Sequence, residues 1–115
     1  PSSTGQRNVA FQVMQAKLKS NPDLKGVFGI NDDSALGALR AVEQTERDIV
    51  IIGYDATPEA RERIKADTAL KADVVQSPKS IGEKTIEAIA QHLAGTAPPK
   101  VIPVGVSVVD RESLK

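Results

Sequence analysis

The sequence contains no cysteine among its 115 residues, which excludes disulfide bonds, thiolate nucleophiles and thiolate metal ligands. Its aromatic residues are one tyrosine and two phenylalanines, too few for a platform on which the bases of single-stranded nucleic acid would stack. No apolar run approaches the roughly 18 residues of a membrane-spanning helix. The 15 basic residues balance the 15 acidic ones, so no basic excess is available for the phosphates of a nucleic acid.

The N-terminus also lacks two common features. Pro1 to Thr4 include neither an initiator methionine nor a basic start that leads into an apolar segment, as a signal peptide would. We therefore expect that processing removed a preceding segment or that the sequence is a piece of a longer chain. The length itself suits one compact domain rather than two.

Helical periodicity and short apolar runs alternate along the chain and predict the order α-β-α-β-α-β-α-β. The predicted helices are 6–19, one that includes 35–42, one that begins at 58, and 78–94; the predicted strands are 27–30, 49–53, 70–74 and a segment within 101–109. An aspartate after residue 30 is expected to cap the second helix. Lys71 and Asp73 alternate with apolar residues and predict one wetter strand face. Pro103 predicts an edge or crossing segment.

Strands that alternate with helices predict an α/β fold, with a three-layer parallel sheet covered by helices on both faces. In such a sheet, ligands bind beyond the carboxyl ends of the strands. Asn31, Asp55 and Gln76 follow three of the predicted strands, and their amide and carboxylate groups suit the hydroxyls of a neutral ligand. Each could instead cap a helix or satisfy loop backbone, and both interpretations remain open.

The sequence contains little evidence for an enzyme. His92, the single histidine, falls within a predicted helix, and no catalytic residue, metal site or cofactor-binding motif is predicted. One alternative is a phosphoryl-accepting site with a metal. Such a site has an acidic pair, a further aspartate and a lysine after three different strands, and the corresponding residues here are Asp32, Asp33, Asp55 and Lys79.

Several segments resemble the sugar-binding proteins of ABC transporters, in the ribose-binding branch. They are Val27–Asp32 with Ala35–Leu39, Ile51–Glu59, Leu70–Pro78 with Ile81-Gly82, and Ile102–Val109. The resemblance implies that Asn31, Asp55 and Gln76 hydrogen-bond sugar hydroxyls, and that Tyr54 lines the ligand cleft or belongs to the core. Where ribose binders carry an aromatic residue that stacks on the sugar, this chain has Gly5, so the preferred sugar or polyol is open.

The resemblance also implies one lobe of a two-lobed, type I periplasmic binding fold, as the C-terminal part of a longer protein. We expect the C-terminal lobe at about 5–76, a helix and strand of the other lobe at about 77–103, and a return crossing with a tail at about 104–115. The implied partners are a monosaccharide or polyol, the missing N-terminal lobe and a membrane permease. The implied location is the periplasm, or the outer surface of a Gram-positive cell by a membrane anchor.

Two further expectations follow. The 78–94 helix has an apolar face, so in isolation it should repack or pair with a second chain, giving a fragment dimer or a domain swap. The effector domain of a LacI-type transcription repressor is the alternative function, because it shares the fold and part of the Asn-Asp and Gly-Tyr-Asp pattern.

Overall fold

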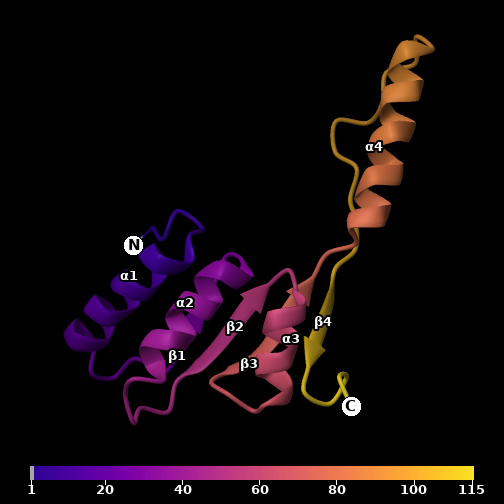
Figure 1. The fold of residues 1–115 in the computed structure, drawn as a ribbon. Helices are drawn as coiled ribbons and strands as arrows, with labels where there is room; N and C mark the ends of the chain where they lie inside the picture. Colours follow the sequence, from indigo (N-terminus) through magenta and orange to yellow (C-terminus); the bar gives the residue numbers. More distant parts are fainter. Residues whose placement is uncertain (1) are drawn as a thin grey trace. The chain divides into compact units, whose positions relative to one another are not determined.

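The computed structural model describes residues 2–115 and has the predicted alternation of helices and strands (Figure 1). The elements, in chain order, are α1 (Arg7–Ser20), β1 (Gly26–Phe28), α2 (Asp32–Val42), β2 (Val50–Tyr54), α3 (Pro58–Lys65), β3 (Leu70–Val75), α4 (Pro78–Leu93) and β4 (Ser107–Asp110). Among these described residues, none of the helices is long and apolar enough to cross a membrane. The chain divides into two compact units, one that runs to Val75 and includes Val108–Lys115, and one that comprises Gln76–Ser107.

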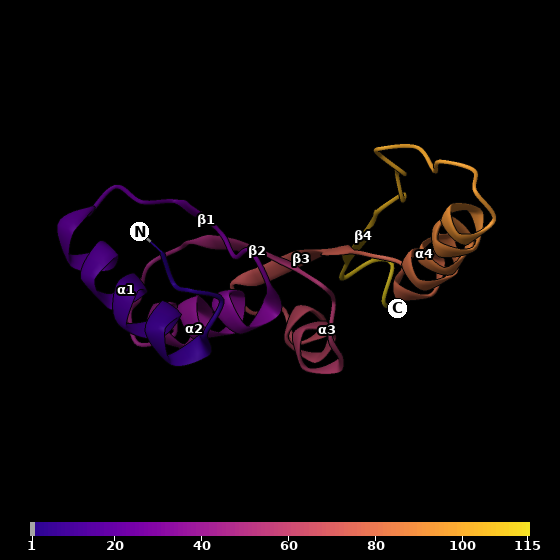
Figure 2. The same ribbon diagram turned by 90° about the horizontal axis from the view of Figure 1, so that it is seen from above.

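The first unit is built on a sheet with the strand order β1-β2-β3-β4. β1 pairs with β2, and β2 with β3, in parallel, which confirms the α/β class. Figure 2 shows α1, α2 and α3 on one side of this sheet. Their apolar residues and the buried side of the strands form a core that includes Leu39, Ile49, Ile51, Ile64 and Leu70.

The opposite face of the sheet differs from the prediction of helices on both faces. Phe28 is 59% exposed and Val50 is 43% exposed, and Figure 2 shows no described helix of the first unit on the side of the sheet opposite α1, α2 and α3. The continuously apolar run 27–30 predicted a buried strand. An apolar run indicates that a strand is suited to burial on both faces, but it does not identify the segment that provides the cover.

α1 packs closely against α2 because Gly37 has no side chain. A Cβ at this position would overlap the backbone carbonyl of Arg7 and lie 2.9 Å from the Cβ of Ala10. Ala10 and Met14 are accordingly the buried residues of α1.

Arg47 closes the turn that follows α1. Its guanidinium donates hydrogen bonds to four backbone carbonyls, those of Leu18, Asn21, Pro22 and Leu24, at 2.9 to 3.0 Å. Because those carbonyls lie at the end of a helix and in the turn after it, one charged side chain satisfies acceptors that have no partner in regular secondary structure.

The predicted strand within 101–109 is shorter in the structure. Only Ser107–Asp110 forms a strand, and 101–106 has no regular secondary structure. Pro103 has no N–H to donate to a sheet, which agrees with the end of strand structure beyond it.

In the second unit, α4 contains no buried residue. Its apolar side and the segment 98–104 line a groove of about 440 Å³, to which Ile81, Ile89, Leu93 and Ile102 contribute. Ile86, on the same helix, is 67% exposed.

Candidate functional site

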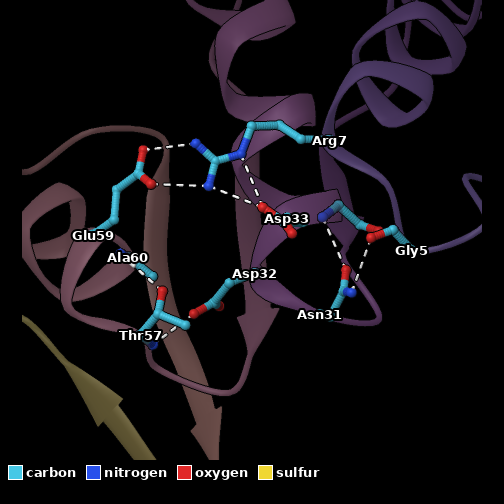
Figure 3. Close-up of polar contacts among 9 residues, drawn as sticks. Gly5, Arg7, Asn31, Asp32, Asp33, Thr57, Glu59 and Ala60 are labelled. Carbon is cyan, nitrogen blue, oxygen red and sulfur yellow. Dashed lines mark hydrogen bonds and ion pairs between the residues drawn. The ribbon is translucent and has the colours of Figure 1, made fainter.

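Asn31 lies just beyond the carboxyl end of β1 and forms the N-cap of α2. Its Oδ1 accepts a hydrogen bond from the backbone N–H of Ser34 at 2.9 Å, and its Nδ2 donates to the carbonyl of Gly5 at 3.0 Å (Figure 3). The cap is therefore the asparagine. The sequence predicted an aspartate in this role, and that prediction was wrong. These two contacts, within residues 2–115, use one N–H and one oxygen lone pair of the half-buried amide, which carries a second of each.

Asp55 occupies the corresponding place beyond β2. It is exposed, and its backbone N–H donates to the carbonyl of Val74 at 2.8 Å. Asp55 and Ala56 have φ angles of 115° and 54°, which L-residues rarely adopt. The chain thus makes a strained turn at this point, and Asp55 lies on that turn, directly beyond the carboxyl end of β2.

Thr57 ends this turn and begins α3. Its hydroxyl accepts from the N–H of Ala60 at 3.4 Å, and Pro58 takes the first helical position, as the sequence predicted. Its own N–H donates to Oδ2 of Asp32 at 2.6 Å (Figure 3). A side chain of α2 therefore holds the turn that carries Asp55.

Tyr54 is the last residue of β2 and is half-buried. Gln76 is also half-buried and comes directly after β3, as the first residue of the second unit. The adjacent parallel pairing of β1 and β2 brings Asn31 and Asp55 to the same edge of the sheet. Gln76 follows the next strand in the order, since β3 pairs with β2.

The sequence did not predict a pair of buried carboxyl groups below this edge. Asp73 of β3 is 0% exposed and Asp32 of α2 is 3% exposed. Strand alternation placed Asp73 on the wetter face, and this prediction was wrong. The pairing of β2 with β3 shifts register between Ile51 and Ile52, which breaks the alternation, so that Leu70 and Asp73 are both buried.

The surroundings of Asp73 favour its neutral form. Burial raises the pKa of this carboxyl to about 8, and the neighbouring Asp32 carboxyl and the negative charge of Asp55 act in the same direction. The backbone N–H of Ala56 opposes the shift in pKa. The protonated form that these surroundings favour is a hydrogen-bond donor rather than an anion.

Arg7 crosslinks the helices beside the site. Its guanidinium forms a bidentate pair with Glu59 of α3 at 2.9 Å, and its Nε donates to Asp33 of α2 at 3.0 Å (Figure 3). The pair with Glu59 contributes most to raising the pKa of Arg7, while burial opposes the shift. The arginine thus links α1, α2 and α3 through contacts at a partly exposed position.

Two of the side chains that the phosphoryl-acceptor alternative would use have other partners. Lys79 forms its ion pair with Glu83, one turn along α4, at 3.8 Å, and Asp32 is occupied by the N–H of Thr57. Within residues 2–115, no group of three or more His, Asp or Glu side chains could hold a metal ion. Beyond β1 and β2, the first unit offers the neutral amide of Asn31 and the exposed Asp55, and these groups suit hydroxyl groups.

Residues 2–97 match the family model described as periplasmic binding protein domain. The chain belongs to this family.

Among its relatives, the chain is 40% identical to the ribose import binding protein of Bacillus subtilis over 96 residues, which are 84% of this chain and 31% of that protein. It is 36% identical to the ribose import binding protein of Escherichia coli, over 89% of this chain and 34% of that protein. The chain thus spans about a third of the length of these relatives.

Solved structures show the same likeness. An ABC transporter solute-binding protein of Agrobacterium vitis with bound D-fucose superposes with a TM-score of 0.84 at 34% identity, covering 99% of this chain and 40% of that one. One from Actinobacillus succinogenes with bound D-allose superposes with a TM-score of 0.85 at 30% identity, covering 99% and 41%. These likenesses confirm the resemblance to sugar-binding transport proteins, and no relative named above is a transcription repressor.

Proposed function

We propose that the protein is the substrate-binding component of an ABC-type sugar importer. The observation that carries this proposal is the placement of Asn31 and Asp55 at the carboxyl ends of two adjacent parallel strands. The relatives also support the proposal. Two of them are described as ribose import binding proteins, and the two solved structures hold D-fucose and D-allose.

In the proposed site, Asn31, Asp55 and Gln76 hydrogen-bond the hydroxyls of a monosaccharide or polyol. The second N–H and second lone pair of the Asn31 amide match a hydroxyl, which both donates and accepts. Asp55 supplies an acceptor of full negative charge, and hydrogen bonds to a charged group are the stronger kind. Tyr54, at the end of β2, is the fourth proposed contact.

The proposed mechanism is hinge closure without catalysis. The first unit is proposed to correspond to the C-terminal lobe, predicted at about 5–76. The remaining lobe would close over the sugar, so that the ligand stabilises the closed state through contacts made only there. The closed form would then dock on the membrane permease. No covalent bond is made or broken.

The second unit is proposed to pack against the rest of a two-lobed protein. Its groove is lined mainly by aliphatic side chains of α4 and 98–104, and an exposed apolar surface of this kind is a site of protein contact. Without that cover, the groove would favour a dimer or a swapped pair of chains. We place the protein in the periplasm, or on the outer surface of a Gram-positive cell.

Calorimetric titration of the full-length protein against pentoses, hexoses and polyols tests this function. We expect one of them to bind at micromolar concentration or below. The absence of binding to the whole panel, combined with binding of a DNA operator that a small molecule releases, would instead support the LacI-type regulator.

A further inference from the structure

The buried pair of Asp32 and Asp73 has no part in the proposed ligand contacts, yet it lies directly below them. Three of its four carboxyl oxygens, Oδ1 of Asp32 and both oxygens of Asp73, have no hydrogen-bond donor among the described residues. The fourth, Oδ2 of Asp32, accepts from the backbone N–H of Thr57 at 2.6 Å. Buried carboxylate oxygens without donors are strongly destabilising, so the pair requires an explanation.

Gly53 shows how close the two carboxyl groups are. A Cβ placed on this glycine would overlap Oδ1 of Asp73 and lie 3.1 Å from Oδ1 of Asp32. The two oxygens therefore converge on one small space on the helix side of β2. Two ionised carboxylates cannot share such a space stably, whereas one proton between them turns the pair into a donor and an acceptor.

We propose that Asp73 is a positioning residue, which donates a hydrogen bond from its protonated carboxyl to Asp32 and so holds Asp32 on the Thr57 amide and fixes the turn that presents Asp55. The role of Asp55 in this inference rests on the proposed function. The turn needs such support because Asp55 and Ala56 both have positive φ angles. It is held from β3 through the Val74 carbonyl and from α2 through Asp32.

Loss of the proton would weaken this support. The charged groups that act on Asp73 are Asp32, from α2, and Asp55, from the turn, and both are acidic. From β2 the group that faces Asp73 is Gly53, which has no charge. An ionised Asp73 would repel both carboxylates, and the Ala56 N–H alone would oppose this repulsion. Alkaline pH should therefore release the turn and lower the affinity for ligand.

Two variants separate the donor from the charge. Asp73→Asn keeps a donor toward Asp32 but does not titrate, whereas Asp73→Ala has no donor. Asp67→Asn is the matched control, because Asp67 is an exposed acid paired with Lys71 and Arg111 and does not contact the pair. The first measurement follows the backbone amide resonance of Thr57 by NMR from pH 6 to 9.5 in the full-length protein without ligand. The second is calorimetric affinity for the bound sugar at pH 7 and pH 9.

We expect the Thr57 resonance to titrate near pH 8 in the native protein and in Asp67→Asn, and to stay constant in Asp73→Asn. Affinity at pH 7 should be within about twofold of native for Asp73→Asn and about tenfold weaker for Asp73→Ala. Between pH 7 and 9 the native affinity should decrease about tenfold, and that of Asp73→Asn should not.

A Thr57 resonance that is constant with pH in the native protein would overturn the inference, and so would native affinity in Asp73→Ala. Absence of sugar binding at every pH, with a Thr57 resonance that still titrates, would refute the proposed function and support the proton-sharing pair.

Discussion

The carboxyl groups of Asp32 and Asp73 meet in one buried space beside Gly53, although the two residues come from different elements, α2 and β3. Asp32 also accepts the Thr57 N–H, and Thr57 starts α3. A helix, a strand and the start of another helix are thus joined through two acidic side chains. This arrangement connects the protonation of a buried group to the geometry of the sheet edge at which we place the ligand.

Stability should depend on pH through Asp73. Its pKa is about 8 in the folded protein against an ordinary value of 3.8, so the folded protein holds one more proton than the unfolded chain between these values. The contribution of Asp73 to stability is complete below pH 4 and decreases as the pH rises to 8, with a slope of up to about 1.4 kcal/mol per pH unit.

Urea unfolding of the native protein and of Asp73→Asn from pH 4 to 9 measures this contribution as a difference. Asp67 and Asp110 have lowered pKa values in the folded protein, so their contributions to stability increase with pH. Both proteins share these contributions, which therefore cancel when the two unfolding free energies are subtracted. Equal pH profiles for the two proteins would contradict a neutral Asp73.

Gly53→Ala should be destabilising, because the new methyl group overlaps the Asp73 carboxyl. Overpacking of this kind costs about 1–3 kcal/mol. In the double variant Gly53→Ala/Asp73→Ala the two effects should not add, since the overlapping oxygens are gone.

Gly82→Ala provides the control for this substitution. No atom lies within 4 Å of a Cβ at that position of α4, and alanine is the better helix former by about 1 kcal/mol. Unfolding in urea should show Gly82→Ala to be at least as stable as the native protein. A Gly53→Ala variant of native stability would refute the close approach of the carboxyl groups.

Asn31 should act both in the helix cap and in the ligand site, and two variants distinguish these roles. Asn31→Ala removes the cap on the Ser34 N–H and should cost about 1 kcal/mol of stability as well as ligand affinity. Asn31→Ser retains a cap oxygen, so thermal unfolding should show a smaller loss, while sugar affinity is lost to a similar extent. Native affinity in Asn31→Ser would assign the residue to the cap alone.

Arg47 should matter more for stability than Arg7. Arg47 donates to four backbone carbonyls in the turn after α1, and Arg47→Met should cost about 2 kcal/mol or more because those carbonyls lose the charged donor. Of the four, only the Asn21 carbonyl keeps a backbone donor within residues 2–115, the N–H of Leu24. Arg7 is 42% exposed and pairs with Asp33 and Glu59, so Arg7→Met should cost less than about 1 kcal/mol, and less still in high salt. The reverse order in denaturant unfolding would be inconsistent with these contacts.

The sequence predicted the order of elements well, because the apolar runs are short and the helix starts are marked. The structure confirms the predicted helix starts at 58 and 78, where Thr57 and Ser77 are the N-caps and Pro58 and Pro78 the first helical residues. The α/β class and the parallel pairing follow from the same alternation. The roles of Asn31, Asp55, Gln76 and Tyr54 in ligand binding stay predictions.

The hydrophobic pattern of the sequence could not predict strand register or contacts between residues far apart in the chain. The register shift between β2 and β3 moves Asp73 into the interior, and no residue near it in the chain indicates that shift. The contact of Arg7 with Glu59 joins residues 52 positions apart. Asp73 could have been noticed only as an acidic residue within an otherwise apolar strand end, Ala72-Asp73-Val74-Val75, and such a residue is more often solvated.

The most direct test of the account is the affinity of the full-length protein and of Asp55→Ala for the sugar or polyol that binds best in the calorimetric panel, with Asp67→Ala as an exposed acidic control. Asp55 lies at the sheet edge and Asp67 follows α3. The account predicts at least a tenfold loss of affinity in Asp55→Ala and native affinity in Asp67→Ala. Equal affinity in all three proteins would contradict the proposal that the strand ends bind the sugar.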